Sequence, residues 1–126
     1  MKKILISFIL VLFAISVCGC TVSSGVSLNM TENNSSHQMT ASYSKYSGYK
    51  KTFITVKSGK TKKVNVSVVT KKGDISLKIT NDDGKLIYQG DKMSTSDFVV
   101  NLDEAGKYTV KVEAKKHSGS FDINWN

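Results

Sequence analysis

Two cysteines, Cys18 and Cys20, are the residues of this 126-residue chain whose position indicates a definite chemistry. They close an N-terminal stretch with a basic start, residues 1–3, and an apolar run over residues 4–17. This order is the layout of a secretory signal peptide. The run is shorter than the roughly 20 residues that a membrane-spanning helix needs, although a retained single-span anchor is the alternative. A metal or redox pair is disfavoured, because no histidine stands near the two cysteines.

The end of this stretch, Val17-Cys18-Gly19-Cys20, resembles the lipobox of bacterial lipoproteins. An aliphatic residue stands three positions before the modified cysteine and a small residue directly before it, although Cys18 occupies a place where Ala, Ser or Thr is commoner. The resemblance implies a signal peptide over residues 1–19 and a diacylglyceryl thioether on Cys20. Two acyl chains anchor a protein stably, whereas one holds it only marginally. We therefore expect a lipid anchor at the extracytoplasmic face of the cell membrane and a mature chain without a disulfide.

Catalytic chemistry has little support in the remaining residues. His37 lies in a polar segment and His117 in an expected surface turn, and no G-x-S-x-G or S-x-x-K motif occurs. A Ser–His–Asp triad that includes His117 stays open, because triads assemble in space rather than in sequence. We predict a protein that is not an enzyme and that needs no cofactor.

Calcium is the one metal that the turns suggest. Asp82 and Asp83 are the leading pair of ligands, since hard carboxylate oxygens suit this ion. No Asp-x-Asp-x-Asp-Gly loop accompanies them, and turn aspartates usually bond their own backbone. A calcium site therefore stays an alternative, and the main expectation is no metal.

Every basic residue is a lysine, and the formal charge is +8. Loss of Lys2 and Lys3 with the leader lowers it by two, to +6. Nucleic acid is not an expected partner, because arginine is the usual residue for bidentate recognition of phosphates and bases. A lysine surface on an anchored protein can instead face an anionic membrane or wall polymer; the alternative is a solvated surface without a ligand. The candidate anion-binding patch comprises Lys60, Lys62, Lys63, Lys71, Lys72, Lys111, Lys115 and Lys116.

Residues 20–49 are rich in Ser, Thr and Asn and keep neither a period of 2 nor one of 3.6. We predict a flexible linker here, which would place the folded domain about 25–35 Å from the lipid. Tyr43, Tyr46 and Tyr49 recur at every third position. We interpret them as linker residues, with a stacking strip for sugar or peptide as the alternative.

From residue 50 onward, apolar and polar residues alternate, as in strands with one buried face. Glycine-rich and aspartate-rich turns separate the runs. Asp82-Asp83-Gly84 suits a hairpin, because Asp-Gly accommodates positive φ, and Trp125 falls on the apolar face. Short strands at this spacing over residues 50–126 favour an antiparallel sandwich or barrel. We expect a single β-sandwich, because the inner faces of two sheets can meet and close a core. The expected strands are 51–57, 62–70, 74–80, 85–89, 96–102, 107–114 and 119–125.

Residues 51–126 resemble the bacterial pre-peptidase C-terminal domain, a small β-sandwich of jelly-roll type. The resemblance lies in five features: the strand-turn-strand opening Phe53–Val66, the segment Gly73–Ile79, the turn Asn81–Ile87, the strand Ala105–Val112 and the closing segment Ser118–Ile123. It implies an all-β fold of about seven or eight strands and a non-catalytic accessory role beside secreted proteases, with calcium or matrix proteins bound by some relatives. No peptidase is attached here, so the likeness supports fold more than function.

These observations favour a lipid-anchored, non-enzymatic β-sandwich that binds an extracellular protein or an anionic wall polymer as a monomer. An accessory or inhibitor of a secreted hydrolase is the second hypothesis, and an enzyme whose site is not visible in the sequence is the third.

The mature chain is predicted to begin at Cys20 with a diacylglyceryl group on its sulfur. Mass spectrometry of the protein isolated from membranes checks this, and Cys20→Ala should abolish the added lipid mass. An unmodified or internal first residue would contradict the anchor.

Overall fold

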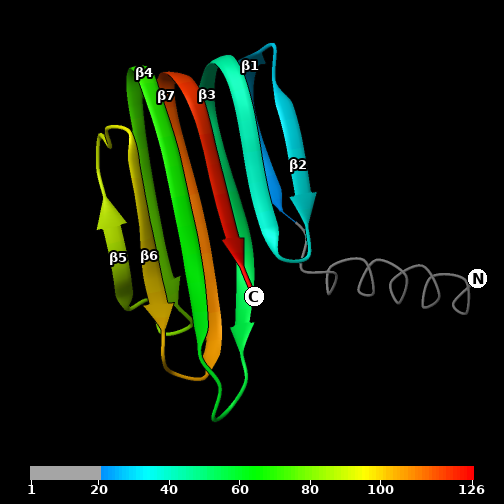
Figure 1. Ribbon diagram of the computed structural model, residues 1–126, viewed down its shortest axis with the longest axis vertical. Helices are drawn as coiled ribbons and strands as arrows, with labels where there is room; N and C mark the ends of the chain where they lie inside the picture. Colours follow the sequence, from blue (N-terminus) through cyan, green and yellow to red (C-terminus); the bar gives the residue numbers. More distant parts are fainter. Residues whose placement is uncertain (1–20) are drawn as a thin grey trace, which may run out of the picture.

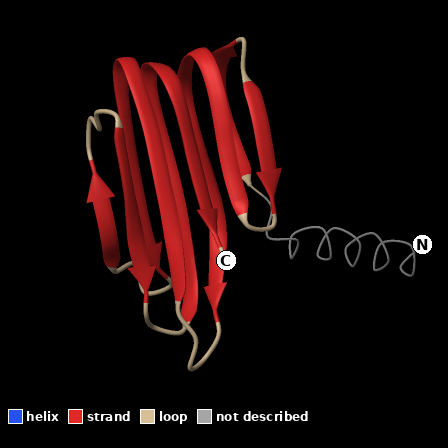
Figure 2. Ribbon diagram, in the orientation of Figure 1, coloured by secondary structure: helices blue, strands red, loops and turns tan. Residues whose placement is uncertain are grey.

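The computed structural model describes residues 21–126, and the predicted signal peptide and Cys20 lie outside this range. The described residues form an antiparallel sheet system of seven strands (Figures 1 and 2), as the alternation predicts. No helix in residues 21–126 is long and apolar enough to cross a membrane. The strands are β1 (Val22–Leu28), β2 (Thr31–Ser35), β3 (Gln38–Val56), β4 (Lys62–Asn81), β5 (Leu86–Gly90), β6 (Ser96–Leu102) and β7 (Gly106–Trp125).

Three strands, β3, β4 and β7, are long because each one bends and contributes to two sheets. The pairing of β3 shifts register between Tyr43 and Gly48, and that of β4 shifts between Thr70 and Asp74. Gly73 lies in the β4 bend with a φ of 78°, and a Cβ atom there would clash with the backbone oxygen of Lys116. Positive φ is accessible to glycine at low cost, so this residue lets the neighbouring bends of β4 and β7 approach closely.

The bends divide the structure into two packed sheets. The first sheet runs β2, early β3, late β7, early β4, β6, and the second runs β1, late β3, early β7, late β4, β5. All bends lie at one end of the sandwich, which we call the bend end. The connections β2–β3, β3–β4, β4–β5 and β6–β7 lie at the opposite end, the open end (Figure 1). The prediction of a β-sandwich is confirmed.

The core lies between the two sheets and is filled by alternate residues of the long strands. In late β4, for example, Ile75, Leu77 and Ile79 are buried while Ser76 and Lys78 face outward. Trp125 belongs to this core, as its place in the alternation predicts. Among residues 21–126, every member of the buried apolar core lies between Met39 and Trp125.

The predicted flexible linker is wrong for residues 22–49. These residues form β1, β2 and the first half of β3, and Tyr43 and Tyr46 are core residues rather than linker residues. The segment is polar because β1 and β2 are edge strands with exposed side chains. Their backbone groups pair with β3 all the same, and this pairing does not depend on side-chain hydrophobicity.

Two predicted turns are also wrong. Residues 72–74 and 118–119 are bends inside β4 and β7, so two pairs of expected strands are each one continuous strand. Gly73 and Gly119 do mark irregular positions of the backbone, as the sequence predicts. Whether a glycine ends a strand or bends it depends on how neighbouring strands pair. The hairpin turn at residues 82–84, by contrast, joins β4 to β5 as predicted.

His117, expected at the surface, is completely buried at the bend end. Its Nδ1 lies 2.6 Å from the hydroxyl of Tyr43 on β3, and its Nε2 lies 2.9 Å from the hydroxyl of Thr70 on β4. The Thr70 hydroxyl donates to the carbonyl oxygen of Met93, so it must accept from Nε2–H. Nδ1 then accepts from Tyr43. This chain of hydrogen bonds holds a neutral imidazole and joins all three bent strands.

A second polar contact crosses the sandwich near its β1–β2 edge. The Lys50 ammonium, on a side chain that is 2% exposed, forms an ion pair with Glu32 of β2 and lies 5.6 Å from the ring centroid of Tyr46. Burial lowers the pKa of Lys50. A buried charge without a partner is costly, so this ion pair fixes β2 over β3.

Stability is predicted to fall as the pH drops below the ordinary histidine pKa of 6.5. Burial lowers the pKa of His117, an effect that Asp74 partly opposes. The unfolded chain therefore takes up a proton before the folded chain does, which favours unfolding in that interval, whereas the contribution is fully present above it. Urea unfolding at pH 7 and at about pH 5.5 measures the change. His117→Gln, which stays neutral, should lose this pH dependence; an unchanged dependence in that variant would refute the assignment.

Candidate functional site

Two surfaces of the molecule combine a hollow with polar side chains. One is a groove on the outer face of the second sheet, and the other is a cleft at the open end. We define the face groove by Ser76, Lys78, Gln89, Asp91, Lys111 and Glu113, and the end cleft by Thr21, Asn34, Ser35, Ser36, His37, Phe53, Ile54, Thr55, Lys57, Lys60, Lys62 and Trp125.

The face groove follows directly from strand alternation. Because the inward positions of late β4 and early β7 are apolar, the positions between them place Lys78, Lys111 and Glu113 on the outer face. The groove encloses about 170 Å³, and a neighbouring hollow of about 440 Å³ shares Asp91 and Glu113 with it. The two hollows thus form one polar depression across β4, β5 and β7.

Both signs of charge occur in the face groove. The Nζ atom of Lys111 lies 2.8 Å from Oε1 of Glu113. The amide of Gln89 donates to both oxygens of the Asp91 carboxylate at 3.3 and 3.2 Å. Ammonium and amide donors therefore stand beside carboxylate acceptors. This mixture suits a ligand with many hydroxyl groups, because a hydroxyl both donates and accepts hydrogen bonds.

A row of lysines crosses the same outer face. Lys51 of β3 is the direct cross-strand neighbour of Lys111, which is in turn the neighbour of Lys78. The ring of Tyr49 lies beside this row, with its centroid 6.0 Å from the Lys51 ammonium and 5.0 Å from that of Lys111. Such contacts partly offset the repulsion between like charges. Tyr49, expected in the linker, thus belongs to the border of the face groove.

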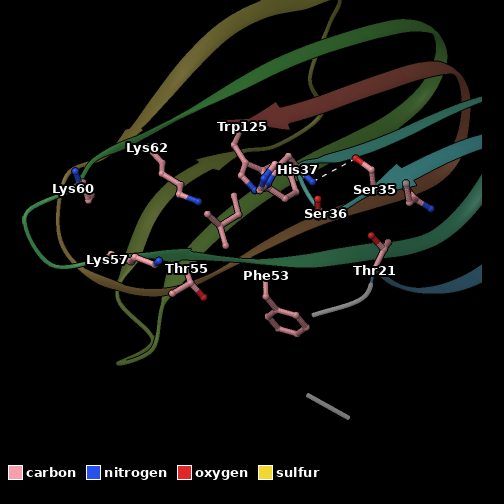
Figure 3. A pocket seen from close by; sticks show the side chains of 12 residues that line it. Thr21, Ser35, Ser36, His37, Phe53, Thr55, Lys57, Lys60, Lys62 and Trp125 are labelled. Atoms are coloured by element: carbon pink, nitrogen blue, oxygen red, sulfur yellow. Dashed lines mark hydrogen bonds between the residues drawn. The ribbon is translucent and has the colours of Figure 1, made fainter. Parts of the chain in front are cut away.

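The end cleft is larger, with a volume of about 810 Å³, and lies where the two sheets separate (Figure 3). Trp125, which is 6% exposed, and Ile54 form its apolar floor. His37 lies beside Trp125, whose backbone N–H donates to the His37 carbonyl oxygen at 3.0 Å. Three lysines, Lys57, Lys60 and Lys62, line the cleft, and none of its lining residues carries a carboxylate.

The predicted lysine patch is not one surface. Lys60, Lys62 and Lys63 lie at the open end, at or next to the start of β4. Four others lie in or beside the bends of β4 and β7: Lys71, Lys72, Lys115 and Lys116. Lys111 lies on the outer face of the second sheet. These lysines are separated because β4 runs the full length of the sandwich between them.

The calcium candidates, Asp82 and Asp83, are exposed in the β4–β5 turn. The Asn81 side chain accepts from the backbone N–H groups of Asp83 and Lys85 at 3.0 and 2.9 Å, so it is this asparagine that organises the turn. Within residues 21–126, no group of three or more His, Cys, Asp or Glu side chains is arranged to hold a metal ion. The structure brings no third acidic ligand to the pair.

Four residues of the face groove were not identified from the sequence, namely Ser76, Lys78, Gln89 and Glu113. Alternation alone places Lys78 and Glu113 on the outer faces of their strands. The missing information was the pairing of late β4 with early β7, which places Ser76 opposite Glu113 and Lys78 opposite Lys111, residues more than thirty positions apart.

No protein-family model matches the sequence, and no curated protein matches it. Solved structures do match the fold. A CBM61 carbohydrate-binding module in complex with β-1,4-galactotriose matches with a TM-score of 0.50 and 13% identity, over 83% of this chain and 85% of that one. The secreted serine protease VesC from Vibrio cholerae matches with a TM-score of 0.50 and 11% identity, over 78% of this chain and 23% of that one.

A low-affinity xylan-binding module, CBM86 from Roseburia intestinalis, matches with a TM-score of 0.44 and 17% identity, over 83% of this chain and 89% of that one. At these identities, the two structures with a TM-score of 0.50 establish the β-sandwich fold.

Replacement of one lysine in the row is predicted to stabilise the protein. Lys78 stands directly opposite Lys111, and like charges in such positions are unfavourable, so Lys78→Gln should raise the free energy of unfolding by about 0.2–1 kcal/mol. Urea unfolding measures the difference. Lys85→Gln in the β4–β5 turn is the control and should have little effect. A destabilised Lys78 variant would show that the row is not under repulsion.

Proposed function

We propose that this chain is a lipid-anchored, non-enzymatic module on the extracytoplasmic face of the membrane that binds a polysaccharide through the face groove. The observation that carries the proposal is the groove itself, an outer-face depression in which Lys78, Lys111 and Gln89 stand beside Glu113 and Asp91. Lipid anchoring is supported by the lipobox resemblance at Cys20.

The chemistry of the face groove favours a neutral, hydroxyl-rich chain over a polyanion. Lys111 already has an acceptor close by, since it is paired with Glu113. A polyanion would have to approach Glu113 and Asp91, which repel it. A sugar hydroxyl can instead donate to either carboxylate and accept from either lysine. Polysaccharide is therefore a better ligand for this groove than the anionic wall polymer expected from the lysine content.

A non-catalytic role is supported by the state of the two histidines. His117, the one histidine for which a triad stayed open, is buried and has both ring nitrogens in hydrogen bonds to Tyr43 and Thr70. His37 is exposed in the β2–β3 turn, and the cleft beside it contains no carboxylate to orient an imidazole. Neither side chain is arranged as a general base next to a serine and an aspartate.

Native affinity electrophoresis tests the proposal. The detergent-solubilised protein is expected to be retarded in gels that contain a neutral polysaccharide such as β-1,4-galactan or xylan. Gln89→Ala combined with Glu113→Ala should weaken retardation about tenfold, because each lost hydrogen bond contributes about 0.5–1.5 kcal/mol. The matched control is Asn101→Ala with Asp97→Ala, two exposed residues of β6 in the other sheet.

Three outcomes would contradict this assignment. Retardation by none of a panel of neutral polysaccharides would remove the proposed ligand class. An equal loss of retardation in the β6 control variant would show that the face groove is not the binding site. Retardation by polygalacturonate alone, abolished by salt, would show that net charge rather than the groove drives binding.

A further inference from the structure

We propose that the end cleft is the membrane-facing surface of this protein and that its three lysines bind the phosphate groups of an anionic bilayer. This orientation rests on the lipid anchor proposed above, but not on the polysaccharide ligand. It assigns the two hollows to different partners. The end cleft at the open end faces the membrane, and the face groove on the outer face of the second sheet binds polysaccharide.

The position of Thr21 is the first argument. Thr21 lines the end cleft and directly precedes β1, which begins at Val22 opposite Lys51. A peptide bond joins Thr21 to Cys20, and neighbouring Cα atoms are about 3.8 Å apart. Residues 22–49, which were predicted as part of a linker, form strands of the sandwich and therefore do not act as a spacer. A lipid on Cys20 therefore holds the cleft close to the bilayer surface.

The charge of the end cleft is the second argument. Lys57, Lys60 and Lys62 line it without any carboxylate among the lining residues, in contrast to the face groove. The open end also carries acidic residues in the β4–β5 and β6–β7 turns, and the β6–β7 turn adjoins the β3–β4 loop, because Gly106 pairs with Val56 and Leu102 pairs with Lys62. The acidic residues are Asp82, Asp83, Asp103 and Glu104. None of these four residues lines the cleft itself, so the charged groups of its lining are lysines.

Apolar groups beside the cleft fit the same partner. Val22 is 41% exposed on the outer face of β1, and Phe53, with the Lys107 ammonium 4.6 Å from its ring centroid, is partly exposed on β3. Apolar side chains next to lysines match the boundary between acyl chains and headgroups. Stable attachment commonly combines an acyl anchor with a basic surface. The face groove, on β4, β5 and β7, remains on the side away from Thr21.

The first experiment measures orientation in the lipidated protein. Ser58→Cys, in the β3–β4 loop between Lys57 and Lys60, is labelled with a fluorophore and reconstituted into vesicles that contain phosphatidylglycerol. Brominated lipids should quench this probe. Ser94→Cys, in the β5–β6 loop at the bend end, is the matched control and should stay unquenched. Quenching of both probes or of neither would overturn the orientation.

The second experiment uses sedimentation to measure how residues 21–126, which form the described sandwich and its core, partition onto phosphatidylglycerol vesicles. A triple variant should partition roughly tenfold to a hundredfold more weakly at low salt; it combines Lys57→Gln, Lys60→Gln and Lys62→Gln. The reason is that each lysine near an anionic surface contributes about 1 kcal/mol to binding. The control removes the same charge elsewhere, through Lys45→Gln, Lys71→Gln and Lys85→Gln, and should weaken partition much less.

The outcomes separate this inference from the function proposed above. Equal effects of the two triple variants would overturn the role of the cleft lysines. A mature chain without lipid on Cys20 would overturn the anchor and this orientation together. The cleft variant could be retarded less by polygalacturonate than the unmodified protein is, while both bind vesicles equally well. That result would assign the cleft to an anionic polysaccharide and overturn the membrane assignment. Binding of neutral polysaccharide by the face groove is unaffected by any of these results.

Discussion

The fold depends on three long strands bending at the same level, and the hydrogen-bond chain through His117 is the interaction that holds these bends together. Tyr43, His117 and Thr70 come from three different strands, and the chain ends on the carbonyl oxygen of Met93 in the β5–β6 loop. A bend interrupts the regular ladder, and polar groups buried there must find partners or cost free energy. With every member of the chain satisfied, the two halves of each strand pack against each other and enclose one core.

This arrangement of bent strands places the two surface hollows at different parts of the sandwich. The bend end is closed by continuous strands, so the sandwich opens at the end where the connections lie. There the sheets separate and leave the end cleft, floored by Trp125 and Ile54. The outer face of the second sheet carries the lysine row and the face groove because its inward positions are occupied by the apolar core. Each hollow therefore results from a different feature of the same fold.

The two hollows differ in electrostatics as well as in size. The face groove contains lysines and carboxylates in contact, whereas the end cleft contains only lysines as charged groups. A mixed site favours ligands that donate and accept hydrogen bonds, and a site of one sign favours an anionic surface. The sequence contains no arginine, so the basic groups of both sites are lysines. A lysine makes a single-point charge contact, because it has no planar guanidinium for bidentate recognition.

The sequence by itself determined the alternation, and with it the all-β class, the inward positions of β4 to β7 and the hairpin at residues 82–84, because side-chain direction along a strand has a period of two. It also placed Trp125 in the core. Only the tertiary structure decided that residues 22–49 are strands, that Gly73 and Gly119 lie in bends, and that His117 is buried. Edge strands and bends depend on backbone pairing between distant segments, which leaves little trace in local hydrophobicity. For the same reason, Lys51, Lys111 and Lys78 form one row only through the register of three strands, which no local pattern of residues specifies.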